Sequence, residues 1–258
     1  MNFESQEGEI HPKDPPVDVV WEDEGLLVVN KPADLVCHPT KGDEYSSLIG
    51  RARLYLHSTP ESPPHLINRL DRETSGLVLI AKTSESARDW RRCWESGDVQ
   101  KTYEAIVHGH VCLDEAWVDL PLGKDTASVV AIKDVVRPDG LPARTHYRVL
   151  SRGQRDQASY TWLCVMPQTG KKHQIRIHLA HIGHPIVGDK IYGGDEQAYL
   201  AFVEKRLSEE QKRRLILRNH ALHAAELRAR CCDRDWHFIA APSSEFVEFR
   251  SQLQTSVC

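Results

Sequence analysis

The chain has 258 residues, 27% of them charged and 40% hydrophobic, and its formal net charge is −4 at pH 7. This composition is typical of a globular protein with a sizeable core, built as one large α/β domain or two small ones, and the negative charge argues against a protein that coats nucleic acid indiscriminately. No apolar run approaches the roughly 18 residues of a membrane span, and the N-terminus has no signal-peptide core, so we expect a cytoplasmic protein.

The cysteines predict free, reduced thiols. Their number, seven, is odd, and no two of them form a CxxC pair. Scattered cysteines without such spacing indicate neither a disulfide framework nor a zinc site, and several should be buried as small apolar side chains. The cysteines are Cys37, Cys93, Cys112, Cys164, Cys231, Cys232 and Cys258.

Ordered structure is expected to begin near Val17. Residues 1–16 contain few apolar side chains and three prolines, so we expect a flexible tail there and one folded domain over residues 17–258. The apolar segments 17–21 and 26–30 flank a turn and predict a β-hairpin. They are followed by apolar residues at helical spacing, which predict a helix within residues 46–57.

An aspartate between two arginines precedes the next predicted strand. Asp71 stands close to Arg69 and Arg72, and a Thr-Ser-Gly turn then leads into the apolar run 77–81, which predicts a loop that feeds a buried strand. The two cations should favour the carboxylate and lower the pKa of Asp71. Gly76 suits a positive φ or the close approach of another backbone. On these residues alone, a solvated ion pair is the commoner interpretation.

A helix and a long strand are predicted to follow. Ser84 is a suitable N-cap and Gly97 a suitable C-terminal residue for the helix, which places two tryptophans on its core face. Residues 99–109 alternate as a strand does when one face is half-buried. Tyr103 lies in this strand, where a half-buried aromatic side chain needs no functional explanation.

The second half of the chain predicts further strands and helices. Residues 113–141 are punctuated by Pro and Gly, and we assign them short strands without a function. Periodicity and capping signals predict antiparallel strands at 143–150 and 159–166, helices at 198–207 and 208–217, strands at 221–227 and 236–241, and a final helix from Ser244.

Residues 169–194 combine a predicted helix with a cluster of basic side chains. The helix should begin after Lys171, Lys172 and His173 and end at Gly183. A helix N-terminus offers free backbone N–H groups, so this end of the helix is a natural place to receive phosphate.

Four histidines in the same stretch raise the question of a metal site. They are His173, His178, His181 and His184. No Glu or Cys accompanies them at the spacing of known zinc sites, and a helix would place His178 and His181 on a different face from His173. We therefore expect no metal.

Four strings resemble, in the same order, the motifs of the RluA family of RNA pseudouridine synthases. They are NKPADLVCHP, NRLDRETSG, KTYEAIVHG and TGKKHQIRIHLAHIGHPIVGDKIYGG, and with the closing LHAAEL and FIAAP the resemblance covers about residues 17–242. It implies a mixed α/β (α+β) pseudouridine synthase fold, in which a central, largely antiparallel sheet forms a catalytic cleft. It also implies a catalytic domain over residues 17–258. Some members carry an S4 domain at the N-terminus, and we expect none here because it does not fit in sixteen residues.

The resemblance implies roles for individual residues. Asp71 corresponds to the family's nucleophile, Tyr103 to the tyrosine that stacks on the target base, and Arg176 to the arginine that pairs with the aspartate. We assign Arg69 to the space that a flipped base vacates, and Ile175 to the other face of the pyrimidine. Substrate and RNA contacts are expected from Arg69, Arg72, Lys171, Lys172, His173 and Ile175.

Four positions depart from the family pattern. Asn68 stands where many members have His, and Asp34 where the usual residue is Gly. We expect the first change to alter local hydrogen bonds and the second to be tolerated, because Asp accepts a left-handed φ better than most residues. Lys171 replaces Arg and Lys172 replaces Thr or Ser, which should change how the RNA backbone is held.

The predicted activity is isomerisation of uridine to pseudouridine in structured ribosomal or transfer RNA, by a monomer that needs no metal or other cofactor. The base must be flipped out of its stack to be reached. Two other interpretations stay open: a catalytically silent RNA-binding relative, which activity of an Asp71→Asn variant would support, and a metal hydrolase that uses the histidines. No feature of the sequence decides between ribosomal and transfer RNA.

Overall fold

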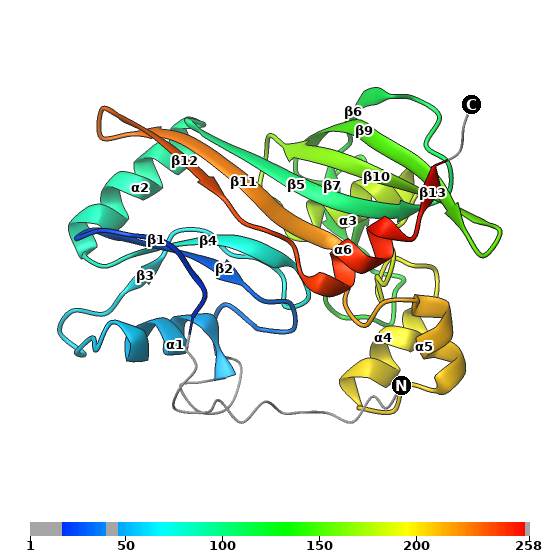
Figure 1. Ribbon diagram of the computed structural model, residues 1–258, viewed down its shortest axis with the longest axis horizontal. Helices are drawn as coiled ribbons and strands as arrows, with labels where there is room; N and C mark the ends of the chain where they lie inside the picture. The colour runs from blue at the N-terminus through cyan, green and yellow to red at the C-terminus, as the bar shows by residue number, and fades with distance from the viewer. Residues whose placement is uncertain (1–16, 40–45, 256–258) are drawn as a thin grey trace.

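The computed structural model describes residues 17–39 and 46–255. The tail expected over residues 1–16 and the thiol of Cys258 lie outside these ranges. The strands (Figure 1) are β1 (Val19–Glu22), β2 (Leu26–Lys31), β3 (His65–Leu66), β4 (Ser75–Ala81), β5 (Val99–His108), β6 (Glu115–Asp119), β7 (Leu122–Lys124), β8 (Asp134–Val136), β9 (Arg144–Arg155), β10 (Ala158–Pro167), β11 (Leu222–Cys231), β12 (Arg234–Ile239) and β13 (Gln254–Thr255). The helices are α1 (Leu48–Tyr55), α2 (Ser84–Ser96), α3 (Gln174–His181), α4 (Glu196–Val203), α5 (Glu209–Leu215) and α6 (Ser244–Ser251). No helix within the described ranges is long and apolar enough to span a membrane.

One large sheet organises the molecule. Its main path runs β1-β2-β4-β11-β5-β10-β9-β13, and β3, β6 and β12 pair at its margins. All the strand pairs of the described chain are antiparallel except β4 with β11. The expected mixed α/β fold with a largely antiparallel central sheet is therefore confirmed.

The parallel pair at the centre of the sheet depends on a glycine. Gly76 of β4 lies opposite Ala224 of β11, and Ala224 in turn lies opposite Tyr103 of β5. Gly76 has φ +114°, and a Cβ atom on it would lie 2.3 Å from the Ala224 carbonyl oxygen. Both properties predicted for Gly76 are confirmed, and the loop that precedes β4 thereby arrives at the N-terminal end of β11, the strand that separates β4 from β5.

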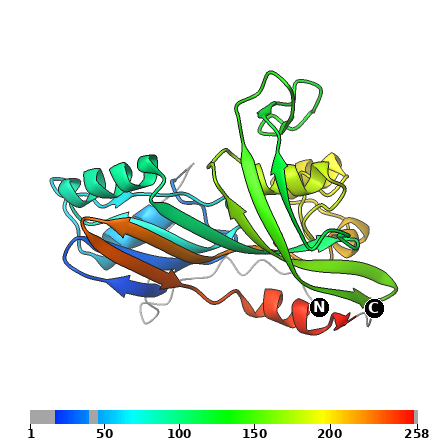
Figure 2. The ribbon, with the colours of Figure 1, turned by 90° about the horizontal axis from the view of Figure 1, so that it is seen from above.

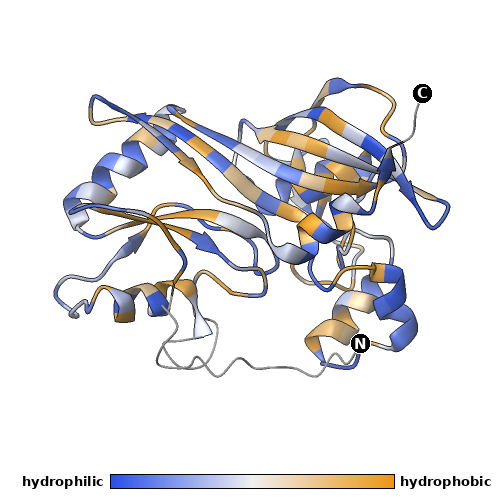
Figure 3. Cartoon of the chain, viewed as in Figure 1, coloured by the Kyte–Doolittle hydropathy of each residue, from blue (hydrophilic) through white to orange (hydrophobic). Residues whose placement is uncertain are grey.

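Helices cover both faces of the sheet, and hydrophobic and hydrophilic bands alternate along the long strands (Figures 2 and 3). On one face, Tyr160 of β10 makes an edge contact with Phe249 of α6, with ring centroids 5.2 Å apart. Because side chains alternate along a strand, Leu163 and Val165 point to the other face, and so does Tyr103 of β5, the register partner of Val165. Leu179 of α3 belongs to the same core cluster as Leu163 and Val165.

Most predicted elements are confirmed to within a few residues, including the first hairpin, the helix of residues 46–57 and the strand of Tyr103. The predicted N-cap of α2 is wrong by one residue. Thr83 is the cap, because its backbone is extended and its side-chain oxygen accepts the Ser86 N–H at 3.1 Å. Ser208 and Gln211 form a capping box at the start of α5.

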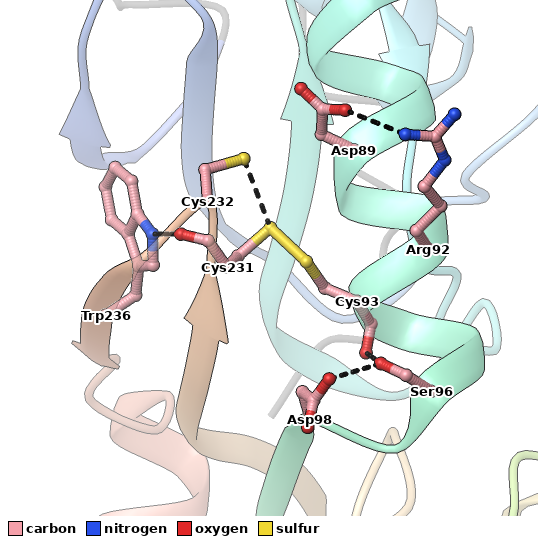
Figure 4. Close-up of a disulfide and its surroundings, with 8 residues drawn as sticks. All are labelled: Asp89, Arg92, Cys93, Ser96, Asp98, Cys231, Cys232 and Trp236. Atoms are coloured by element: carbon pink, nitrogen blue, oxygen red, sulfur yellow. Dashed lines mark hydrogen bonds and ion pairs between the residues drawn. A yellow bond between two sulfur atoms is a disulfide. The ribbon is translucent and has the colours of Figure 1, made fainter.

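The expectation that the cysteines are all reduced is wrong for one pair. Figure 4 shows a disulfide between Cys93 of α2 and Cys231 of β11, whose Cα atoms lie 5.7 Å apart. Their separation of 138 residues carries no local signal, since only the packing of α2 beside β11 brings the two side chains within bonding reach. The free cysteines of the described chain are Cys37, Cys112, Cys164 and Cys232.

Replacing Gly76 by Ala should prevent the parallel pairing of β4 with β11. We expect Gly76→Ala to lower the free energy of unfolding by about 3 kcal/mol or more, because its Cβ would collide with backbone. Gly97→Ala is the matched control: its φ is also positive, at +87°, but nothing lies within 4 Å of the added atom. It should cost only about 1–2 kcal/mol. Urea unfolding of both variants measures the difference, and equal losses would contradict the role of this backbone contact.

Candidate active site

Asp71 and Arg176 meet at the centre of the site. The Arg176 Nη1 donates to Asp71 Oδ2 at 2.8 Å, although the two residues are 105 positions apart. The Arg176 side chain is 4% exposed, whereas that of Asp71 is 29% exposed. The carboxylate is thus held from the protein side and open to a ligand on the other. The structure brings together these two predicted site residues, and their roles in a reaction stay predictions.

A second carboxylate fixes the guanidinium. Arg176 Nε and Nη2 donate to the two oxygens of Asp189 at 2.7 and 2.9 Å, and the Asp189 carboxylate also accepts the N–H groups of Ile191 and Tyr192. Such a bidentate pair restricts the guanidinium in position and direction. Sequence reasoning missed Asp189, although its GDK string lies inside the matched motif.

The charge beside Asp71 comes from a different source than predicted. Burial pushes the pKa of Asp71 upward, but the charge and hydrogen bond of Arg176, together with the nearby His173 and His220, bring the pKa below its ordinary value. The predicted neighbours do not form this contact: Arg69 is exposed, and Arg72 pairs with Asp34. The predicted direction of the shift is confirmed and its predicted cause is wrong, because the Arg69 side chain is exposed and that of Arg72 is engaged by Asp34.

Tyr103 lies close to the same carboxylate. Its pKa is raised by burial and then by the negative charge of Asp71, so the hydroxyl is neutral. The ring packs against the cluster that contains Leu163 and Val165 but is only partly buried. No hydrogen bond joins its hydroxyl to another residue of the described chain. The partly exposed ring next to Asp71 has the placement that a stacking platform needs.

His173 joins the site rather than forming a phosphate pocket at the helix end. Its φ is +55°, its Nδ1 lies 2.9 Å from the Tyr192 hydroxyl oxygen, and its Nε2 lies 3.8 Å from Asp71 Oδ2. Burial, and then the charge of Arg176, lower its pKa to about 4. His173 is therefore neutral at pH 7 and adds no charge for binding phosphate.

The three other residues near this helix that were predicted to contact RNA or the base are partly engaged within the protein. Lys172 pairs with Asp134 at 2.8 Å, and the N–H of exposed Lys171 donates to the Gln174 side chain. Ile175 is buried, at 6% exposure, within the core cluster. Only Lys171 among the three thus presents a side chain to solvent without an ion pair in the described structure.

A buried lysine ties the Asp71 loop to the loop after β2. The Lys31 Nζ donates to the carbonyls of Pro32 and Leu35, each at 2.8 Å, and to that of Arg72 at 3.1 Å. Burial lowers the pKa of Lys31 to about 8. Sequence reasoning assigned no role to this residue, although it is the lysine of the NKP string.

A second buried group supports the loop from the other side. Lys190 donates to the Glu73 carboxylate and to the Arg218 carbonyl, and Thr74 Oγ1 lies 2.7 Å from His220 Nε2. Burial lowers the pKa of His220 to about 3, so its ring is neutral. Its Nδ1 is the one fully buried side-chain N or O atom of the described residues without a hydrogen-bond partner. Glu73, Thr74, Lys190 and His220 were all missed from sequence.

The histidines of residues 173–184 do not converge. His178 lies within hydrogen-bond distance of Thr145 Oγ1 and the Leu120 carbonyl, and His184 Nδ1 lies 3.0 Å from the His108 carbonyl. No group of three or more His, Cys, Asp or Glu side chains in the described ranges is arranged to hold a metal ion.

Comparison with known proteins identifies relatives of the chain. The family described as RNA pseudouridylate synthase matches residues 25–181. Ribosomal large subunit pseudouridine synthase D of Escherichia coli strain K12 is 34% identical over 224 residues, which cover 86% of this chain and 65% of the relative. The protein of the same name from Salmonella typhimurium strain LT2 is 32% identical over 242 residues, covering 92% and 69%. The chain spans about 65% of the length of the E. coli relative.

Two human structures share the fold. RNA Pseudouridylate Synthase Domain Containing 1 superposes with a TM-score of 0.72 at 21% identity, covering 96% of this chain and 92% of the human chain. RNA Pseudouridylate Synthase Domain Containing 4 superposes with a TM-score of 0.70 at 24% identity, covering 93% and 94%. At such identities the likeness concerns the arrangement of the backbone.

Removing the charge of Asp189 should destabilise the protein. Asp189→Asn would leave the buried Arg176 with one carboxylate instead of two, and we expect a loss of about 3–5 kcal/mol in the free energy of unfolding. Asp195→Asn is the control, because Asp195 is the N-cap of α4 and Asn caps a helix equally well. Urea denaturation followed by tryptophan fluorescence measures both. A loss below about 1 kcal/mol for Asp189→Asn would contradict the proposed support of Arg176.

Proposed function

The chain belongs to the RNA pseudouridylate synthase family, in its RluA branch, and on that premise we propose that it isomerises uridine in RNA to pseudouridine. One observation carries the proposal: the Asp71 carboxylate is kept ionised and directed by the buried Arg176, yet remains 29% exposed beside Tyr103. A carboxylate nucleophile needs this combination of a fixed direction and an open side.

The product is an isomer of uridine. The bond between ribose and N1 of uracil breaks, the uracil turns, and a carbon–carbon bond forms from its C5 to the ribose. C5 then loses its hydrogen as a proton, and N1 gains a proton, so no atom is gained or lost overall. In our proposal Asp71 attacks the ribose or the uracil, or assists proton removal, as carboxylates do at the anomeric centre in glycosidases. The pair with Arg176 keeps the carboxylate charged while bound substrate excludes water.

Three further residues are proposed to hold the flipped base. Tyr103 offers a partly exposed aromatic ring, on which a base can stack. Arg69 is exposed and forms no ion pair with the described residues, so its side chain is free to enter the space that the base leaves. Ile175 would border the opposite face of the pyrimidine from its position in the core cluster. Base stacking returns part of the cost of flipping.

We propose ribosomal RNA of the large subunit as the substrate. The support is that the Escherichia coli and Salmonella relatives are named ribosomal large subunit pseudouridine synthases, and transfer RNA is the second candidate. Arg72 and Lys171 present exposed cationic side chains for the RNA backbone, and Lys172 would join them by exchanging Asp134 for phosphate. The expected monomer and cytoplasmic location stay predictions.

Pseudouridine mapping of RNA from cells that lack this gene tests the proposal. We expect one or a few sites to lose pseudouridine, wild-type protein to restore them, and Asp71→Asn protein at equal abundance to restore none. Asp114→Asn serves as the control, because Asp114 is exposed and pairs with Arg152 away from the site. Restoration by Asp71→Asn would exclude Asp71 as the nucleophile. Unchanged pseudouridine at all sites, with RNA binding retained, would favour a silent RNA-binding protein.

A further inference from the structure

Asp34 adopts a backbone conformation that favours glycine. Its φ is +65°, and the family motif that its segment resembles has Gly at this position. The structure shows what the aspartate adds there. Its Oδ1 pairs with Arg72 Nε at 2.7 Å and its Oδ2 with Arg218 Nη2 at 3.2 Å. A single carboxylate thus holds two arginines from distant parts of the chain next to each other.

Buried lysines anchor the backbones of both arginines through hydrogen bonds. The Arg72 carbonyl accepts a hydrogen bond from the Nζ of buried Lys31 at 3.1 Å, and the Arg218 carbonyl accepts one from the Nζ of buried Lys190 at 2.5 Å. The Arg218 N–H also donates to Glu245 at 3.0 Å. The arginine side chains, in contrast, are 55% and 53% exposed. Fixed backbones with exposed guanidinium groups are typical of a binding surface rather than of a core ion pair.

The two guanidinium groups keep most of their donors for a ligand. Asp34 occupies one nitrogen of each, and neither forms another hydrogen bond with the described residues. Two arginines and one aspartate leave a net charge of +1. Phe202 lies under Arg72, 5.5 Å from its guanidinium carbon, and limits its movement. Paired guanidinium groups with free N–H donors match the geometry of a phosphate group.

We propose that Asp34, Arg72 and Arg218 form a binding site for a phosphodiester of the RNA strand, with Asp34 holding the two arginines in the binding geometry. This inference rests on the proposed function. The ligand is a backbone phosphate close to the target uridine, because Arg72 directly follows Asp71 in the chain. Arg218 and Asp34 thereby become RNA-binding and positioning residues that none of the motifs indicates.

Steady-state kinetics of the full-length protein on a ribosomal RNA transcript, over a range of KCl concentrations, tests the site. We expect Arg218→Ala to raise KM about 5- to 10-fold at unchanged kcat, and to reduce the slope of log KM against log salt by about 0.7–0.9, the value for one phosphate contact. Arg230→Ala is the control: Arg230 is 64% exposed and pairs with Asp235 at the far end of β11. Arg230→Ala removes the same charge and should leave KM within twofold of the wild-type value.

Asp34→Gly tests the positioning role, since Gly suits the left-handed φ. The variant makes the protein less negative, so simple electrostatics predicts a lower KM. If the carboxylate holds the arginines in place, KM instead rises about 3-fold or more, and Arg218→Ala has a smaller effect in the Asp34→Gly background than in wild type. An unchanged or lower KM in Asp34→Gly would overturn the role of Asp34.

Two further outcomes distinguish a failure of the phosphate site from a failure of the proposed function. If 10 mM inorganic phosphate at constant ionic strength inhibits wild type while Arg218→Ala leaves KM for RNA unchanged, the arginines bind free phosphate and the proposal fails. If wild type converts no uridine, the proposed function fails instead. The phosphate site is then tested by the anisotropy of labelled RNA, where Arg218→Ala must weaken binding relative to Arg230→Ala. Equal binding by the two variants would overturn it.

Discussion

The buried guanidinium of Arg176 between two carboxylates is the interaction on which the rest of the site depends. Asp189 takes two of its nitrogens and Asp71 a third. A guanidinium buried to this degree requires compensation by charge and hydrogen bonds. Because Asp189 is itself fully buried and receives backbone N–H groups, it serves as the fixed partner, and Asp71 is the partner that faces outward. The same charge lowers the pKa of both carboxylates.

The sheet and two buried lysines give this ion pair its geometry. The parallel contact of Gly76 with Ala224 places the Asp71 loop at the N-terminal end of β11, and Tyr103 of β5 pairs with Ala224 from the other side of that strand. Lys31 and Lys190 then fix the loop from two sides through backbone carbonyls and the Glu73 side chain. The loop therefore presents Asp71 and Arg72 at the surface while these hydrogen bonds fix its backbone. Because the backbone is fixed, Arg72 can be exposed and still keep its position relative to Asp71.

Local patterns were sufficient to predict the strand after Asp71, the freedom of Gly76 and the family motifs. They were insufficient wherever a partner is distant in sequence. The charge beside Asp71 was attributed to Arg69 and Arg72, which are close in sequence, but it comes from Arg176. The Cys93–Cys231 disulfide was missed for the same reason. Pairing between distant residues follows from the packing of strands and helices, which periodicity and spacing do not specify.

A titration of Asp71 tests the central claim most directly. Carboxyl ¹³C chemical shifts of aspartate-labelled protein, followed between pH 2 and 7, report the pKa of each side chain, and the signal missing from Asp71→Asn identifies Asp71. We predict a midpoint below the ordinary value of about 3.9, because Arg176 stabilises the carboxylate. A midpoint at or above that value would mean that burial dominates, and would contradict the view that Arg176 keeps Asp71 ionised for catalysis.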